Sequence, residues 1–338
     1  MHRCRPVTNV LLLALALPAQ GAAQGAAAAD VDESSSAGVA TAVEAVLQAP
    51  PAERSAAVHR LIAAGSPALE AVRAARDGAD DPDIRRAFEK AATWILAREI
   101  VPELERGLES QLVYDGQYAG LERFGAEGVR ALLAIVDDSA TDLAVRVVAC
   151  RAIADVGGAS AAPALRRLHD DILLPQVLRE QIGILLAVFG DTHAVEKELR
   201  DHERFARHED TRVRLSSLQQ LSNLHYRIRR YKKAVEYYEE IIAIYRDVLE
   251  AQERRDAPEQ VLEFLRRELA LQYYNAACSN TLHGDIEKAK DYLLRAVRVE
   301  PMHYDNMEKD GDLRGLRAHP DYGAFREELG KLFEGQDL

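Results

Sequence analysis

The residues best suited to bind a metal ion are two His-Glu pairs, His202-Glu203 and His208-Glu209. Zinc proteases bind their metal through two histidines four residues apart on one helix face, with a glutamate beside them as general base. The two histidines here are six residues apart, which puts them about 120° apart around a helix of 3.6 residues per turn. The spacing excludes a zinc site of this kind and favours a solvated, charged helix face.

Two other groups could in principle do chemistry, the acidic stretch 305–312 and the cysteines. The acids and Gly311 do not follow the order of a calcium-binding loop, so we predict that Asp312 caps a short helix. Cys150 and Cys278 lie within helical apolar patterns, where a thiol is buried and is not activated. The sequence contains no phosphate loop, G-x-S-x-G elbow or C-x-x-C pair. We therefore predict no catalytic residue, no metal and no cofactor.

A basic run over residues 226–233 mixes tyrosines with arginines and lysines, as surfaces that bind single-stranded nucleic acid do. Three glutamates follow it closely, at Glu236, Glu239 and Glu240, and the whole chain has a formal net charge of −12. An acidic protein gains little from sequence-independent attraction to nucleic acid or anionic lipid. We expect a solvated turn with ion pairs along the next helix, and no nucleic-acid partner.

The elements that position these residues are helices, and some recur at a fixed interval. Three arginines and two aspartates recur at steps of 33 residues: Arg146, Arg179, Arg212, Asp138 and Asp171. A fixed period with two helical faces per unit is typical of a stacked solenoid. The units resemble HEAT-type repeats over about residues 40–215. We expect each arginine to pair with an aspartate of its own or the next unit and so to fix the stacking; a row of arginines that binds an anion is the alternative.

The stretch 273–301 has the interlocking small and large residues of a different helix pair. The positions that carry this pattern are Tyr273, Ala276, Ala277, Gly284, Asp285, Ala289, Leu293 and Ala296. It resembles a tetratricopeptide repeat, which implies a stacking α-hairpin with a groove for a partner and no reaction. Residues 215–241 resemble a second such hairpin, in which Ala234 and Tyr238 match Ala289 and Leu293. The extra length between the two hairpins lies in 244–271, which we predict to be extended helices.

Two asparagines support the most specific binding hypothesis. In tetratricopeptide domains that hold a terminal carboxylate, one asparagine comes from the first helix of each of two successive repeats, and Asn223 and Asn275 fall at the matching positions. We predict a partner-binding surface of Gln219, Asn223, Tyr274 and Asn275. Gln219 replaces the lysine of such sites, and charged donors hold a carboxylate best. The alternative is that both asparagines bond neighbouring helices or water.

The N-terminus is typical of an export signal, with a basic start, an apolar run over 10–17 and small residues over 18–29. We predict a signal peptide over 1–25 and a flexible linker over 26–38, and hence a periplasmic or extracellular protein of a bacterium. Eight apolar residues are too few to span a hydrocarbon core of roughly 30 Å, so we expect no integral membrane segment after cleavage. An uncleaved anchor is the alternative.

The sequence thus predicts an all-α fold, an α-solenoid of stacked antiparallel helix pairs. HEAT-like repeats are expected over 39–210, tetratricopeptide-like hairpins over 211–300 and a C-terminal cap over 301–338, in which Leu313, Leu316, Tyr322 and Phe325 cover the last apolar face. The predicted function is a non-catalytic interaction or scaffold module of the cell envelope, which binds a protein or peptide on a helix-lined groove. An enzyme-accessory or lyase-like HEAT-type protein and a structural envelope component are the alternatives.

Overall fold

The computed structural model describes residues 34–109, 116–300 and 307–334. These residues form helices and turns without a strand, so the predicted all-α fold is confirmed. Among them, no helix is both long enough and apolar enough to cross a bilayer. The predicted signal peptide, most of the predicted linker, Pro301 and Asp305 lie outside the described residues.

The described residues pack as two compact units. The N-terminal unit contains residues 34–109 and 118–179, and the C-terminal unit contains chiefly residues 180–300 and 307–334. The division lies within α8 (Gln176–Val188), whereas the sequence-based boundary between the two repeat types stands at residue 210.

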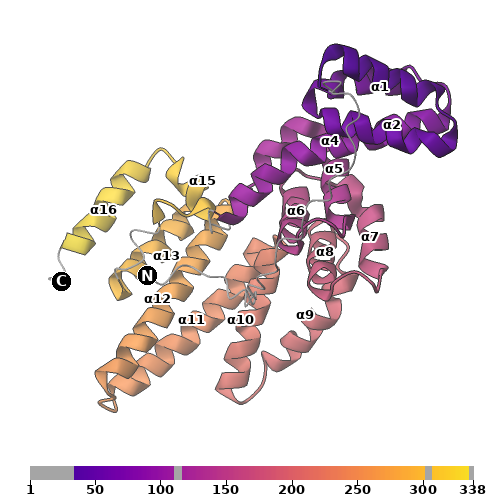
Figure 1. The fold of residues 1–338 in the computed structure, drawn as a ribbon. Helices are drawn as coiled ribbons and strands as arrows, with labels where there is room; N and C mark the ends of the chain where they lie inside the picture. Colours follow the sequence, from indigo (N-terminus) through magenta and orange to yellow (C-terminus); the bar gives the residue numbers. More distant parts are fainter. Residues whose placement is uncertain (1–33, 110–115, 301–306, 335–338) are drawn as a thin grey trace. The chain divides into compact units, whose positions relative to one another are not determined.

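The N-terminal unit consists of helices joined by short connections, so that successive helices pair (Figure 1). Its elements are α1 (Ser36–Gln48), α2 (Pro51–Ala64), η1 (Ser66–Ala68), α3 (Leu69–Asp77), α4 (Pro82–Glu109), η2 (Ala119–Phe124), α5 (Gly125–Asp137), α6 (Leu143–Asp155), η3 (Ala159–Ala161) and α7 (Ala162–Asp170). The second helices of successive pairs contact one another, α2 with α4 and α4 with α6, while α1 contacts α3 and α5 contacts α7. Two layers of helices result, as in an α-solenoid.

The recurring aspartates turn the chain after the first helix of a pair. Asp138 Oδ1 accepts a hydrogen bond from the N–H of Ala140 at 3.1 Å, and Asp171 Oδ1 accepts one from the N–H of Leu173 at 2.9 Å. An aspartate that bonds the backbone two residues ahead mimics a turn of the main chain. The same aspartate-stabilised turn therefore occurs at both positions, 33 residues apart.

The recurring arginines lie in three different settings. Arg146 is buried and donates from Nε to the carbonyl oxygen of Val136 at 2.9 Å, near the end of α5. We expected an aspartate of its own or the next unit as its partner, but Asp138 accepts from the Thr141 hydroxyl at 2.7 Å. Arg179 Nε is buried without a hydrogen-bond partner among the described residues, and Arg212 is exposed. Arg146 thus joins two helices through a backbone carbonyl, and a common stacking role for the three arginines stays a prediction.

In the C-terminal unit, α8 is followed by α9 (His193–Phe205), α10 (Thr211–Arg227), α11 (Tyr231–Glu253), α12 (Glu259–His283), α13 (Ile286–Val299), η5 (Gly311–Leu313), α15 (Arg314–Arg317) and α16 (Tyr322–Glu334). From α9 to α13, each helix packs on the next (Figure 1). η5 and α15 contact α12, and α16 contacts α13. Leu313, Leu316 and Phe325 are buried in the core of this unit, and Tyr322 packs against it half-buried.

The hairpin of α12 and α13 owes its shape to its turn and to its small residues. Gly284 has φ of +90°, a left-handed conformation that glycine adopts without strain, and its N–H donates to Thr281 O at 3.0 Å. Asp285 then accepts from the N–H of Lys288 at 3.3 Å and begins α13. The small residues at the helix contacts are all fully buried: Ala276, Ala277, Ala289 and Ala296. Ala234 and Tyr238 of the preceding hairpin are buried in the same core.

Candidate functional site

One face of α10 stays away from the core. Its residues recur at steps of three and four, as neighbours on one side of a helix do: Ser216, Gln220, Asn223 and Arg227. Leu218, Leu221 and Leu224, on the other side, are buried. We call the first set the α10 stripe.

A corresponding stripe runs along α12. Its incompletely buried residues also follow steps of three and four: Phe264, Glu268, Leu271 and Asn275. Asn223 and Asn275 thus occupy the outward faces of the first helices of two successive hairpins. Neither side-chain amide has a hydrogen-bond partner among the described residues. Each amide can therefore offer two donors and one acceptor to another molecule.

Gln219, the third residue of the predicted surface, is engaged within the protein. Its side chain hydrogen-bonds the Tyr245 hydroxyl, which donates to Glu268 Oε2 at 3.5 Å. Burial raises the pKa of Glu268 and raises the pKa of Tyr245 to about 12. Glu268 belongs to the α12 stripe. An acidic side chain thus lies near Gln219, at the position where a carboxylate-binding site would need a cation. This setting disfavours an anionic peptide terminus and favours neutral main-chain groups as ligands of the two asparagines.

Tyr274 does not belong to this surface, and its prediction as a partner contact is wrong. Its side chain is 0% exposed, and its hydroxyl donates to Asp310 Oδ2 at 3.0 Å. The reason is that α12 packs against α11 on one side and against α13 and η5 on the others, so both Tyr273 and Tyr274 point into the core. A tyrosine can lie in a binding surface or in a core, provided that its hydroxyl has a hydrogen-bond acceptor.

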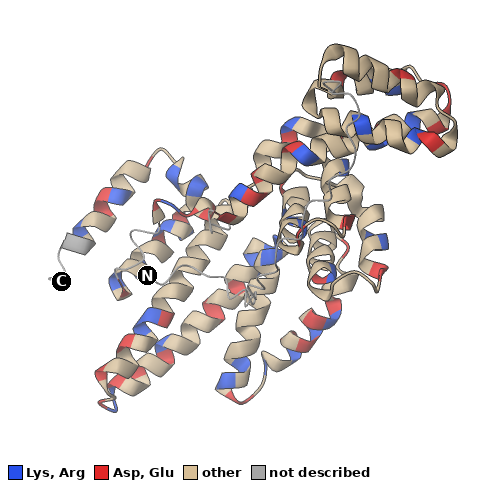
Figure 2. Ribbon diagram, viewed as in Figure 1, with Lys and Arg blue, Asp and Glu red and all other residues tan. Residues whose placement is uncertain are grey.

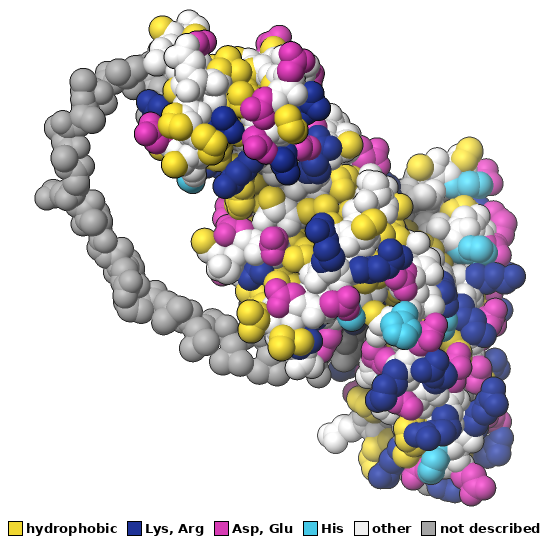
Figure 3. Space-filling model, turned by 90° about the vertical axis from the view of Figure 1, so that its right-hand side faces the viewer, with side chains coloured by type: hydrophobic (Ala, Val, Ile, Leu, Met, Phe, Trp, Pro, Cys, Tyr) yellow, Lys and Arg dark blue, Asp and Glu magenta, His cyan; other side chains and the backbone are white. Residues whose placement is uncertain are grey.

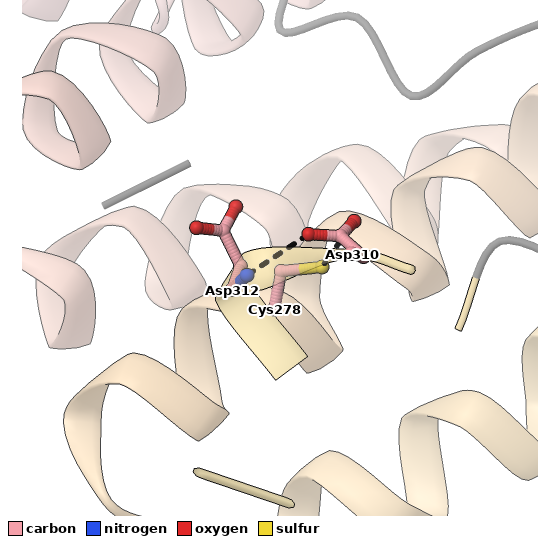
Figure 4. Close-up of side chains that lie close together, drawn as sticks. All are labelled: Cys278, Asp310 and Asp312. Carbon is pink, nitrogen blue, oxygen red and sulfur yellow. Dashed lines mark hydrogen bonds between the residues drawn. The ribbon is translucent and has the colours of Figure 1, made fainter. Parts of the chain in front are cut away.

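A polar cluster, which we call the η5 cluster, consists of Cys278, Asp310 and Asp312 (Figure 4). Asp310 accepts hydrogen bonds from the N–H of Asp312 at 2.9 Å and from the Cys278 thiol at 3.8 Å, besides that from Tyr274. Asp312 accepts one from the Tyr226 hydroxyl of α10. Burial, reinforced by Asp312, raises the pKa of Tyr226 well above its ordinary value, so this hydroxyl remains a donor. The cluster thereby fastens η5 to both α10 and α12.

The predicted role of Asp312 as a helix cap is wrong, because Asp310 is the N-terminal cap of η5. Asp312, two residues further on, is buried and accepts the hydrogen bond from Tyr226. By ligand type and proximity the three groups of the η5 cluster could hold a metal ion, since their ligand atoms lie within 4.8 Å of one another. They already accept or donate hydrogen bonds within the protein, so a cation would have to displace those bonds.

A second acidic group, formed by Glu287, His319 and Asp321, lies near the surface. The ammonium of Lys290 is 2.8 Å from Glu287 Oε1 and 3.8 Å from Asp321 Oδ2. This lysine supplies the positive charge that the two carboxylates need, so the group is explained as an ion-pair network.

In the basic run over 226–233, between α10 and α11, Arg230, Lys232 and Lys233 are exposed as expected of a solvated turn, whereas Ile228 is buried in the core. Lys233 Nζ lies 2.6 Å from Glu236 Oε2 one turn ahead, and both side chains are exposed. Lysines and arginines are interspersed with acids along the helices (Figure 2), and the face shown in Figure 3 mixes basic, acidic and hydrophobic side chains. On the face that Figure 3 shows, basic and acidic side chains of the described residues lie close to one another.

His225 was missed by sequence reasoning. It is 4% exposed, it stacks on Tyr237 with ring centroids 5.4 Å apart, and neither ring nitrogen has a hydrogen-bond partner among the described residues. Burial, helped by the charges of Arg230 and Lys233, lowers its pKa to about 4. A neutral, unsatisfied histidine breaks the rule that buried polar groups are paired, and no local pattern in the sequence signals it.

Comparison with protein families identifies one repeat. A tetratricopeptide repeat matches residues 215–248, which cover most of α10 and of α11. The match falls on the upstream hairpin, and the stretch 273–301 lies outside it. Comparisons with curated proteins and with solved structures give no significant match. Residues 215–248 are therefore similar to a tetratricopeptide repeat, a unit that suggests protein–protein interaction or scaffolding and that is generally found in non-catalytic proteins.

Proposed function

We propose that the chain is an exported, non-catalytic interaction module of the cell envelope, which binds a partner polypeptide across the α10 and α12 stripes. The observation that carries this proposal is the pair of asparagines, Asn223 and Asn275, whose amides have no partner among the described residues. The similarity of residues 215–248 to a tetratricopeptide repeat supports it. Export is supported by the signal-like composition of the first 25 residues.

The stripes match the needs of an extended polypeptide. An asparagine amide can donate to a main-chain carbonyl and accept from a main-chain N–H. These bonds hold a polypeptide backbone through its neutral groups. On α12, Leu271 and Phe264 offer apolar contact along the same side, and Phe264 is 57% exposed. We propose that the partner places its backbone on the asparagines and an apolar side chain on Leu271 or Phe264.

We further propose that the helix pairs of the N-terminal unit are HEAT-type repeats. The repeated turn at Asp138 and Asp171 and the two layers of helices support this assignment.

The decisive experiment compares photo-crosslinking in the native envelope before and after removal of the two amides. A photoreactive amino acid at Gln220, an exposed position of the α10 stripe, reports the partner by mass spectrometry. The double variant Asn223→Ala/Asn275→Ala should reduce the yield of that crosslink at least about tenfold, as loss of two hydrogen bonds to a partner predicts.

The matched control is Gln181→Ala/Gln252→Ala, which removes two amides from α8 and α11. Its crosslink yield should equal that of the original chain, and circular dichroism should show the same helix content in all three proteins. An unchanged crosslink in the Asn223→Ala/Asn275→Ala variant would refute the proposed surface.

A further inference from the structure

The N-terminal unit contains a cleft of about 530 Å³ that the proposed function does not use. Its lining comes from α2 and α4, with one residue each from α5 and from the loop that follows α5. The residues that decide its chemistry are His59, Lys90, Trp94, Arg98, Val101 and Ile135. Its size is within the range of 300–1,000 Å³ that is usual for ligand-binding clefts.

The lining of the cleft carries positive charge and no carboxylate. Lys90 and Arg98 are its two charged residues. Neither has an acidic partner within ion-pair distance among the described residues; Arg98 Nη1 donates to the carbonyl oxygen of Ile62 at 3.0 Å. Elsewhere in this unit Arg73 pairs with Glu127, with Arg73 Nε 2.8 Å from Glu127 Oε2. Two cations that face a cleft without compensation, in a chain of net charge −12, favour an anionic occupant.

The remaining walls are apolar. Ile62 and Ala97 are buried in the floor, and Trp94 is half-buried, so that part of its ring faces the cleft. A large aromatic face beside aliphatic side chains stabilises a bound hydrophobic group. The cleft therefore combines a hydrophobic contact with two cations on one helix, α4.

We propose that this cleft binds an acidic, apolar segment of a partner protein, with an aliphatic or aromatic side chain against Trp94 and Asp or Glu side chains paired with Lys90 and Arg98. The site is separate from the α10 and α12 stripes, and it does not depend on the function proposed for them. Charge complementarity gives the specificity, and the hydrophobic contact gives much of the affinity.

Trp94 makes the test direct, because it is the single tryptophan of the chain. Its fluorescence is followed in the full-length protein while three peptides of about eight residues without tryptophan are added. One alternates Leu and Phe with Asp and Glu, the second has Asn and Gln in place of the acids, and the third has Lys. The acidic peptide should give a saturable change that weakens at high salt, and the other two should bind at least about tenfold more weakly.

Variants locate the site. Lys90→Glu and Arg98→Gln should each weaken binding of the acidic peptide at least about tenfold. Arg60→Glu, which changes the charge by as much as Lys90→Glu at an exposed position of α2 outside the lining, should leave the affinity unchanged. Lys90 makes no described side-chain bond, so its variant should keep the helix content. The proposal is overturned if Trp94 does not respond to the acidic peptide, if the neutral peptide binds equally well, or if folded Lys90→Glu binds as before. A Trp94 signal that changes with protein concentration alone would assign the cleft to a second copy and would also overturn it.

Discussion

The two compact units of the chain differ in what their cores contain. The N-terminal unit is built on aliphatic and aromatic side chains such as Phe88, Ile95 and Leu104, and Arg146 is its one buried charged or polar side chain among the described residues. The C-terminal unit buries polar groups in number: Ser217, Ser222, His225, Gln272, Ser279, Asn280, Thr281 and Asp312. The difference shows that similar helix stacking can rest on two kinds of interior.

Each kind of interior has a physical consequence. An apolar core is non-directional, so substitutions that conserve volume are tolerated. A buried polar group is costly unless its hydrogen bonds are made, and those bonds have fixed directions. Thr281 and Asn280 meet this need locally, by donating to carbonyl oxygens four residues earlier in α12. The η5 cluster meets it between elements, and we expect the C-terminal unit to be the more sensitive to single polar substitutions and to pH.

The largest expected effect is at Tyr274. Tyr274→Ala should lower the free energy of unfolding by about 4 kcal/mol through the cavity it leaves, as Phe88→Ala should in the N-terminal unit. Tyr274→Phe should still cost about 1–2 kcal/mol, since Asp310 loses a hydrogen-bond donor in a buried setting. Urea unfolding followed by circular dichroism measures both changes. If Tyr274→Phe leaves the free energy of unfolding unchanged, the hydrogen bond to Asp310 contributes nothing to stability, and the contrast between the two units is removed.

The next effect is a pH dependence caused by His225. Its pKa is about 4 in the folded chain and about 6.5 when exposed. Between these values the unfolded chain binds a proton that the folded chain does not, so the stability due to neutral His225 is complete above pH 6.5 and is lost as the pH falls towards 4. The loss should reach at most about 3 kcal/mol.

His225→Leu removes this titration. The free energy of unfolding of the variant should therefore fall less than that of the original chain between pH 7 and pH 4.5, when both are measured by urea unfolding. Carboxylates that titrate in the same range are common to both proteins and cancel in the comparison. Equal pH dependence in the two proteins would contradict the assignment.

The smallest effect concerns the repeated arginines. Arg146→Met should destabilise the chain by about 2 kcal/mol, since the carbonyl of Val136 loses a charged donor. Arg179→Met should cost less than about 0.5 kcal/mol or even stabilise, because Arg179 Nε is buried without a partner among the described residues. Thermal unfolding of the two variants side by side distinguishes them. Equal losses would support one shared stacking role for both arginines.

Much of the architecture was predictable from the sequence because it depends on local rules. The helix pairs follow from apolar periodicity, the turn at Gly284 needs a left-handed residue, and the packing positions Ala277 and Ala289 must be small where helices approach closely. The 33-residue interval picked out two aspartates, Asp138 and Asp171, that make the same backbone turn, whereas we expected them to pair with the repeated arginines.

The candidate site was less predictable because it depends on contacts between distant residues. Tyr274 was assigned to the surface since its partner, Asp310, lies 36 residues further along the chain. The helix cap was assigned to Asp312, but Asp310 makes it, because Asp312 is turned inward to the Tyr226 hydroxyl. Asn223 and Asn275 were placed on outward helix faces by a family pattern, and their binding role stays a proposal.

The η5 cluster has one more consequence, for the length of the stack. If the last hairpin of a helical array left its apolar face exposed, the helices of another molecule could pack on that face, and the chains could polymerise. In this chain α12 and α13 are covered by η5, α15 and α16, and η5 is secured by hydroxyl–carboxylate bonds from α10 and α12. A helix without two carboxylates at matching positions would lack the acceptors that the Tyr226 and Tyr274 hydroxyls use here. The two aspartates thus hold in place the segment that covers the end of the helix stack.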